Sequence, residues 1–133
     1  MHLFTTQHST AFRLLLAAAV ILFTWQTLTP HPVPLPIHNG DKLAHAGAFF
    51  ALAFLVDGAW PNRPLGWRML LLLTVYGGAI ELAQHYVPNR DTSALDLAAD
   101  VAGLLLYAGP VGPWLRRRDT AGRWTDDLTI PLK

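Results

Sequence analysis

Apolar residues are gathered into four long runs separated by short polar or proline-containing segments. The runs cover about residues 11–29, 43–60, 65–86 and 94–115. At a rise of about 1.5 Å per residue, a helix of this length crosses a hydrocarbon core roughly 30 Å thick, with some tilt or help from flanking residues. No alternating strand pattern competes, and open sheet edges cannot face lipid. The pattern predicts an all-α integral membrane bundle of four transmembrane helices.

Prolines mark the breaks between these runs. They lie between the first and second runs, between the second and third, and at the end of the fourth, at Pro110 and Pro113. Because proline lacks a backbone donor and clashes with the preceding turn, each break is expected to end a helix. We therefore predict one transmembrane domain over residues 1–115 and a polar, poorly ordered cytoplasmic tail over residues 116–133.

The first run has a second interpretation, that of a cleaved signal peptide. Arg13 followed by LLLAAAVILF resembles a short charged start and an apolar centre. After Phe23, however, no small-residue cleavage pattern follows. We therefore expect this run to be retained as a helix.

Positive charge is distributed unevenly along the predicted path. Lys42 and Arg90 lie on one side of the bundle, and seven arginines lie on the other, together with Lys133. The seven are Arg13, Arg63, Arg68, Arg116, Arg117, Arg118 and Arg123. Since cytoplasmic loops of membrane proteins carry an excess of Lys and Arg, both termini should be cytoplasmic and the loops near His38 and Arg90 outside.

Composition excludes several other classes of protein. Of the 133 residues, 52% are hydrophobic and only 14% are charged, which is too apolar for an ordinary soluble domain of this size. No cysteine is present, so neither disulfides nor thiolates contribute chemistry. A net charge of +1 without a basic, aromatic-rich patch gives no indication of nucleic-acid binding.

Several ionisable side chains lie in or against the apolar runs. A charge at the centre of a membrane helix costs roughly 2.5–3.5 kcal/mol on insertion scales, so such residues normally have a partner or a function. Counted along the helices, five of them fall within roughly 10 Å of the outer boundary, in one layer. These five are Asp41, His45, Glu81, Asp96 and Asp100. Asp57, by contrast, lies near the inner end of the second run, where its side chain can reach the interface.

Some of these residues have simpler interpretations. Ser93 and Asp96 fit a capping box that would start the fourth helix, which does not exclude a second role for Asp96. Asp41 follows Asn-Gly and could cap the second helix, and Lys42 could extend to the lipid headgroups.

Glu81 and Asp100 are not at helix ends, so each needs a buried partner. Arg90 is the obvious candidate, because one guanidinium can bridge two carboxylates with paired hydrogen bonds. A purely structural network of these three residues is therefore an alternative to a functional pocket.

Metal ligation has weaker support in the sequence. His45, His85, Glu81 and Asp41 are suitable ligand types, but no compact motif such as H-E-x-x-H occurs. We therefore predict neither a metal site nor a cofactor.

At these polar residues the chain resembles the VanZ-like family of small bacterial membrane proteins. The resemblance lies in D-K-L-A-H at residues 41–45, E-L-A-Q at residues 81–84 and P-N-R-D-T-S-A-L-D-L-A-A-D at residues 88–100, followed by Gly103. It covers about residues 41–107. The order and spacing of the three motifs across three helices carry it, since each is weak alone.

The resemblance implies a set of characteristic polar positions and a location in the bacterial cytoplasmic (inner) membrane. The positions are Asp41, Lys42, His45, Glu81, Gln84, Arg90, Ser93, Asp96 and Asp100. Asp100 departs from the family, where Asn is more frequent. The founding member is associated with low-level teicoplanin resistance, which implies the cell envelope but does not transfer resistance to this chain.

Two functional hypotheses follow. In the first, the outward-facing layer binds or modifies an envelope lipid or a lipid-linked sugar phosphate, with Lys42 and Arg90 holding the anionic head group. His45 would then act with Glu81 or Asp100 as acid and base, and Asp41, Gln84, Ser93 and Asp96 would contribute to binding. In the second, the chain is a non-enzymatic membrane subunit whose polar layer is structural or docks a protein partner of unknown identity.

Overall fold

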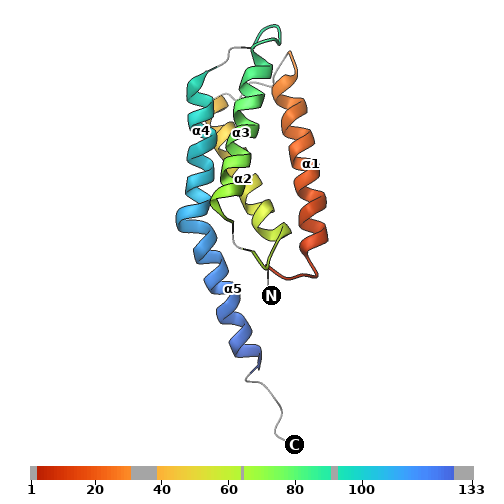
Figure 1. Cartoon of the computed structure of the whole chain (residues 1–133), viewed down its shortest axis with the longest axis vertical. Helices are drawn as coiled ribbons and strands as arrows, with labels where there is room; N and C mark the ends of the chain where they lie inside the picture. Colours follow the sequence, from red (N-terminus) through yellow and green to blue (C-terminus); the bar gives the residue numbers. More distant parts are fainter. Residues whose placement is uncertain (1–2, 31–38, 64, 91–92, 128–133) are drawn as a thin grey trace, which may run out of the picture.

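The computed structural model describes residues 3–30, 39–63, 65–90 and 93–127, with side chains described up to residue 120. Within these ranges the chain is helical and contains no strand. Figure 1 shows α1 to α4 side by side, with α5 projecting beyond one end of the bundle. The elements are α1 (Ser9–Leu28), α2 (Gly40–Ala59), α3 (Trp67–Gln84), α4 (Ala94–Leu106), the π-helical turn η1 (Tyr107–Val111) and α5 (Gly112–Asp127).

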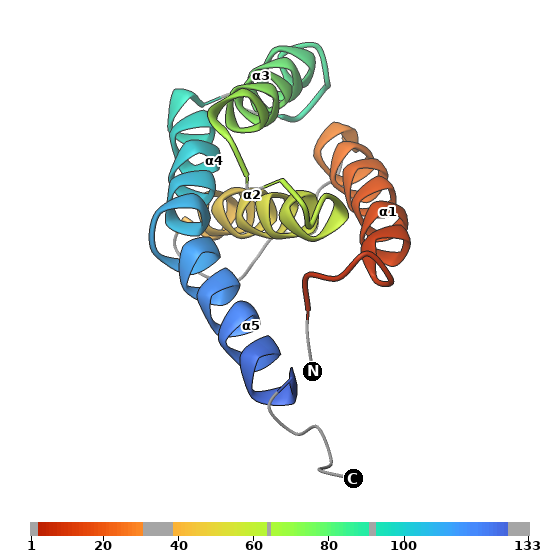
Figure 2. The ribbon, with the colours of Figure 1, turned by 60° about the horizontal axis from the view of Figure 1, so that its bottom comes forward.

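The helix α2 is the central element of the bundle. It packs chiefly against α4 and α1, and α3 completes the arrangement by contacting α4 and α1 (Figure 2). The chain runs in the same direction along α2 and α4, because His45 contacts Asp100 near one end and Asp57 contacts Tyr107 at the other. The helix between them, α3, therefore returns along the length of the bundle. We name the two ends the Glu81 end and the Asp57 end.

The distribution of apolar side chains is that of a protein surrounded by lipid. Small and aromatic residues fill the interior, among them Phe49 and Ala53, both fully buried. Large apolar side chains such as Leu14, Leu22 and Leu72 remain mostly exposed on the outer faces, where a soluble protein would avoid them. In the described part of the chain, three helices are long and apolar enough to cross a membrane: Thr6–Leu28, Gly40–Ala59 and Ala94–Thr120. The chain is a multi-pass membrane protein.

Glycine permits α2 and α4 to approach closely. A Cβ atom at Gly103 would lie 2.1 Å from the backbone oxygen of Ala46, so no larger residue fits without moving the helices apart. At Gly77 of α3, a Cβ atom would lie 2.6 Å from Oδ2 of Asp100. These two small residues create the space in which Asp100 is buried.

The fourth apolar run differs from its prediction. We expected the helix to end near Leu115 at its two prolines, but it continues through η1 into α5 and reaches Asp127. The π-helical turn explains the continuation, because it shifts the hydrogen-bond register around Pro110, and the amide of Gly112 donates to the carbonyl of Tyr107. The prediction of a poorly ordered segment directly after residue 115 is therefore wrong.

Basic residues are separated between the two ends as the sequence predicts. Arg13 donates to the carbonyl of Ala59, and Arg116 contacts Asp57, so both lie at the Asp57 end. Lys42 and Arg90 lie at the Glu81 end, in the first turn of α2 and in the connection between α3 and α4. Of the two predicted outer loops, the part at residues 31–38 and residues 91–92 lie outside the described residues.

Candidate functional site

A buried histidine–aspartate pair joins α2 to α4 at the Glu81 end. His45 Nδ1 lies 2.9 Å from Oδ1 of Asp100, and the two side chains are 9% and 0% exposed. The edge of the imidazole also packs against the ring of Phe23 from α1. The carboxylate therefore fixes the orientation of a histidine ring inside an apolar bundle.

Glu81 of α3 reaches across to the start of α4. Its Oε2 atom accepts a hydrogen bond from the backbone amide of Ser93 at 3.2 Å. Ser93 is the N-cap of α4, as the sequence predicts, and its hydroxyl accepts from the amide of Leu95. The capping box is incomplete, however, because Glu81 takes the position that Asp96 would occupy in that motif. Asp96 is therefore available for other contacts.

Asp96 lies in the interior beside the first turn of α2. Its Oδ1 atom lies 3.4 Å from Nζ of Lys42, which also donates to Asp41 at 2.9 Å. The Lys42–Asp96 contact is an ion pair without hydrogen-bond geometry, because Oδ1 remains without a hydrogen-bond partner. Asp41 makes no cap, since the N-cap of α2 is Asn39 and has no side-chain cap bond. Lys42 thus links the two aspartates.

The side chains of His45, Glu81, Asp96 and Asp100, here named the His45 cluster, come together from three helices. One ligand atom each from His45, Glu81 and Asp96 lies within 4.8 Å of the others, and Asp100 joins them through His45. Three carboxylate oxygens, Glu81 Oε1, Asp96 Oδ1 and Asp100 Oδ2, are buried without a hydrogen-bond partner. Four of the five residues predicted to share one layer therefore come together, whereas the fifth, Asp41, is mostly exposed and contacts Lys42.

Arg90 does not bridge Glu81 and Asp100, so the predicted three-residue network is wrong. Its guanidinium instead donates to the backbone carbonyls of Thr29, at 3.0 Å, and Gln26. Those carbonyls lie at the C-terminal end of α1, where helical partners are missing and a basic side chain is favourable. Burial lowers the pKa of the Arg90 guanidinium from its ordinary value, because desolvation penalises its charge.

Gln84 makes the same kind of contact. Its amide nitrogen donates to the carbonyl of Thr27 at 3.1 Å, and the side chain is almost fully buried. Gln84 and Arg90 therefore fasten the end of α1 to the α3 side of the bundle. Both lie at the predicted end, but their side chains donate hydrogen bonds to backbone carbonyls.

A groove on the surface leads to Glu81. It has a volume of about 340 Å³ and lies between the end of α3 and the start of α4. Polar side chains form part of its lining and apolar ones the rest: Glu81, His85 and Ser93 with Leu82, Ala94 and Leu97. Leu82 faces outward, 65% exposed. The groove therefore connects the His45 cluster to the surroundings of the bundle.

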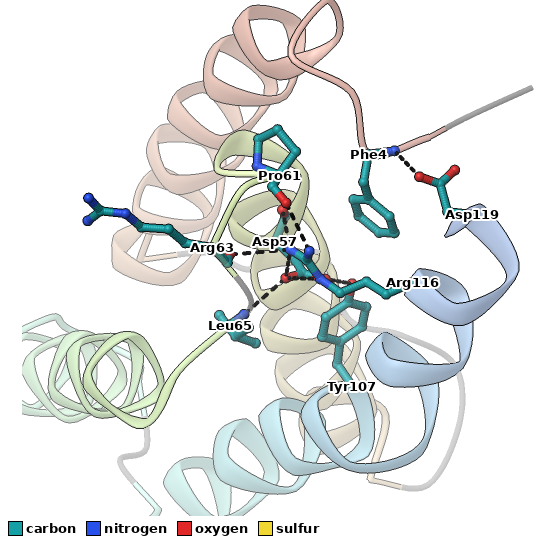
Figure 3. Close-up of polar contacts among 8 residues, drawn as sticks. All are labelled: Phe4, Asp57, Pro61, Arg63, Leu65, Tyr107, Arg116 and Asp119. Atoms are coloured by element: carbon teal, nitrogen blue, oxygen red, sulfur yellow. Dashed lines mark hydrogen bonds and ion pairs between the residues drawn. The ribbon is translucent and has the colours of Figure 1, made fainter. Parts of the chain in front are cut away.

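A second polar cluster, at the Asp57 end, was missed in the sequence analysis. Asp57, Tyr107 and Arg116, here named the Asp57 cluster, form a dense set of hydrogen bonds (Figure 3). Arg116 donates to Asp57 Oδ1 at 2.6 Å through Nη2, and the Tyr107 hydroxyl donates to Oδ2 at 2.9 Å. The amide of Leu65 also donates to Oδ1. A small cavity of about 160 Å³ adjoins the cluster.

The π-helical turn explains why sequence spacing could not reveal this cluster. In an α-helix nine residues rotate by about 900°, which would place Tyr107 and Arg116 on opposite faces. The π turn absorbs additional residues per turn, and both side chains meet Asp57. The only available signal was an aspartate in an apolar run with arginines at the same predicted end.

The N-terminal residues are attached to the same end of the bundle. The amides of Leu3 and Phe4 donate to the carboxylate of Asp119 at 2.7 and 3.3 Å, and the guanidinium of Arg116 lies 5.1 Å from the centre of the Phe4 ring. Figure 3 shows both contacts on one side of α5. A salt bridge, several hydrogen bonds and a cation–π contact thus hold this end of the bundle together.

No family model, curated protein or solved structure matches this chain.

Proposed function

We propose that this chain is a VanZ-like protein of the bacterial cytoplasmic membrane that binds the head group of an envelope lipid or of a lipid-linked sugar phosphate at its Glu81 end. The family is proposed from the three motifs that place Asp41, His45, Glu81 and Asp100. The ligand class is proposed from the chemistry of the groove and the polar residues beside it.

The groove beside Glu81 is the observation that carries this proposal. Its lining combines three polar with three apolar residues, and it opens beside the outward-facing side chain of Leu82. A ligand that places a polar head near Glu81 and Ser93 while keeping an apolar chain against Leu82 and Leu97 satisfies both parts of the lining. Lipids have this composition, whereas a soluble metabolite would leave the apolar part exposed.

The proposed roles of individual residues follow their contacts. Lys42, partly exposed and paired with two aspartates, supplies the nearest positive charge for a phosphate. Arg90 is assigned to holding α1 instead of the head group. Asp100 orients the imidazole of His45, an arrangement that positions a histidine for proton transfer. If the site is catalytic, we propose His45 as its acid or base.

The structural-subunit alternative has one supporting observation. Gln84 and Arg90 both bind backbone carbonyls of α1, as residues that only hold helices together would. The His45 cluster does not fit that interpretation, because a structural network normally satisfies its buried carboxylate oxygens. We therefore retain ligand binding as the function of the cluster.

Lipid binding can be tested by native mass spectrometry of the purified chain. Leu97→Trp fills the groove, and Leu95→Trp is the matched control, because Leu95 lies two residues away on α4 and is 63% exposed. The wild type and Leu95→Trp should retain a co-purified lipid that Leu97→Trp loses. A wild type without bound lipid, or equal retention by all three proteins, would contradict the proposal.

The proposed membrane arrangement has four crossings, with the Asp57 end in the cytoplasm. Two observations support it: α2 and α4 run in the same direction, which requires α3 to return between them, and Arg13 and Arg116 lie together at the Asp57 end. The chain has no native cysteine, so single cysteines can report sidedness.

Cysteine labelling in intact cells tests this arrangement. Cysteines introduced at His38 and Asp91 should react with an impermeant maleimide, whereas one at Asp126 should react only after the cells are lysed. Labelling of Asp126→Cys alone in intact cells would reverse the orientation and place the groove on the cytoplasmic side.

A further inference from the structure

The geometry points to a binding site for a divalent transition-metal cation, with Zn²⁺ and Mn²⁺ the best matches, formed by His45, Glu81 and Asp96. This inference goes beyond lipid binding and does not depend on a lipid being the ligand of the groove. It also replaces the expectation from sequence that no metal site exists.

The three residues supply the ligand atoms that such an ion requires. An imidazole nitrogen and two carboxylate oxygens lie within 4.8 Å of one another. Ligand atoms around a tetrahedral ion with bonds of about 2.1 Å are roughly 3.4 Å apart, so side-chain rotations of modest size bring all three into place. One imidazole with two carboxylates suits Zn²⁺ or Mn²⁺ better than Ca²⁺, which prefers oxygen ligands alone.

Asp100 prepares His45 for this role. Its carboxylate can only accept, so the Nδ1 proton of His45 lies in the 2.9 Å bond between them. The lone pair of the ring is then on Nε2, the atom available to an ion. A carboxylate that binds the far nitrogen of a ligating histidine is a recurrent feature of metal sites, where it fixes the tautomer and the ring orientation.

The unsatisfied oxygens are the second, independent observation. Glu81 Oε1 and Asp96 Oδ1 are buried and have no hydrogen-bond donor, and the Asp96 side chain is 8% exposed. Lys42 Nζ forms an ion pair with Asp96 Oδ1 at 3.4 Å without hydrogen-bond geometry. Two buried acceptors beside a histidine therefore lack hydrogen-bond donors, and the ion pair with Lys42 compensates only the charge of Asp96.

The groove supplies an access route. Its lining includes Glu81 and Ser93, and Glu81 is only half-buried, so an ion can reach the first ligand without helix separation. Glu81 is the one proposed ligand that lines the groove, and His45 and Asp96 are buried. An ion held by all three would keep coordination positions on the side of Glu81 for water or a ligand head group, as in sites where a metal meets substrate.

The test is a titration of the full chain, purified in detergent with a histidine-free affinity tag and stripped of metal by a chelator. Zn²⁺ and Mn²⁺ are added separately and without lipid, with binding measured by calorimetry and stoichiometry by elemental analysis. One ion per chain should bind with micromolar or tighter affinity. Binding weaker than micromolar for both ions would overturn the site regardless of any result with lipids.

Matched variants locate the ion. Asp96→Asn should weaken binding by at least about tenfold, whereas Asp41→Asn, which removes the same charge from an exposed neighbour, should change it little. His45→Gln and the exposed control His85→Gln form a second pair. Equal losses in the two aspartate variants would show that only diffuse negative charge attracts the ion. Equal losses in the two histidine variants would show that His45 is not a specific ligand. Either result would overturn the proposal.

The role of Asp100 is separable from ligation. Asp100→Asn should reduce affinity by about 10–100-fold while keeping one ion per chain. Each metal-free variant is compared with the wild type by its unfolding temperature. If one variant fails to fold, the remaining members of the set, Glu81→Gln included, decide the outcome.

Discussion

The two polar clusters at opposite ends of the bundle differ in how completely their charges are compensated. At the Asp57 end, one buried carboxylate receives hydrogen bonds from an arginine, a tyrosine and a backbone amide. At the Glu81 end, three carboxylates share a histidine, one backbone amide and one lysine in ion-pair contact, and three of their oxygens have no hydrogen-bond donor. Both clusters occupy an apolar bundle, where such groups are expensive.

This difference indicates a structural role for the Asp57 cluster and a ligand-binding role for the His45 cluster. Arg116 uses its remaining donors on the carbonyls of Pro61 and Arg63, so the Asp57 cluster also fixes the chain after α2. Nothing in that cluster requires a ligand. In the His45 cluster, by contrast, three carboxylate oxygens have no hydrogen-bond donor, and Glu81 lines an open groove through which a ligand can reach them. Incomplete compensation is therefore the stronger indication of function.

Removing Arg116 should have the largest effect on stability. Arg116→Met leaves Asp57, 2% exposed, as an uncompensated buried carboxylate, and breaking such a pair typically costs about 3–5 kcal/mol. The free energy of unfolding in detergent should fall by an amount in this range. The double variant Asp57→Asn with Arg116→Met should recover much of the loss, and a double variant no more stable than Arg116→Met would argue against the pair as its cause.

The helices themselves could be predicted because lipid imposes a simple pattern. Three of the four predicted runs begin and end within three residues of α1, α2 and α3, since apolar length is what a bilayer selects. The fourth extends further for a local reason. A proline normally ends a helix, but the π turn around Pro110 accommodates it. The pattern of apolar and polar residues does not predict that turn.

The sequence was sufficient to predict which residues gather in the candidate site, but not which of them form hydrogen bonds or ion pairs with one another. Spacings of four residues placed Asp41 with His45 and Asp96 with Asp100 at one level. The partners depended on how helices approach one another: Asp100 reaches His45 because Gly103 brings α4 against α2. Arg90 binds backbone carbonyls at the end of α1 instead of the predicted carboxylates. Such distances between helices are set by tertiary packing, which a single sequence does not display.

A smaller effect is expected from Lys42, the cation nearest the His45 cluster. Lys42→Met removes a positive charge 3.4 Å from Asp96, so a divalent ion should meet less repulsion. Its affinity should rise by about threefold to tenfold at low salt, and the gain should shrink as salt screens the charge. Calorimetric titration of both proteins at two ionic strengths measures this. Weaker ion binding in Lys42→Met would mean that Lys42 supports the site instead of competing with the ion.

The smallest change in unfolding free energy is expected for Glu81→Gln, and it distinguishes the two clusters most clearly. Glu81→Gln keeps an acceptor for the Ser93 amide and removes a charge from a group of crowded carboxylates. The unfolding free energy of the metal-free protein should stay the same or rise, by at most about 1 kcal/mol.

The matched substitution at the other end should act in the opposite direction. Asp57→Asn removes a carboxylate that the guanidinium of Arg116 fully engages, so its unfolding free energy should fall by about 3 kcal/mol. Thermal and denaturant unfolding of both variants in one detergent measures the contrast. If Glu81→Gln lost as much stability as Asp57→Asn, the His45 cluster would be a structural network like the one at the Asp57 end. If removing the charge of Glu81 leaves the protein equally stable, that charge is not needed for folding, as expected of a residue whose role is to bind a ligand.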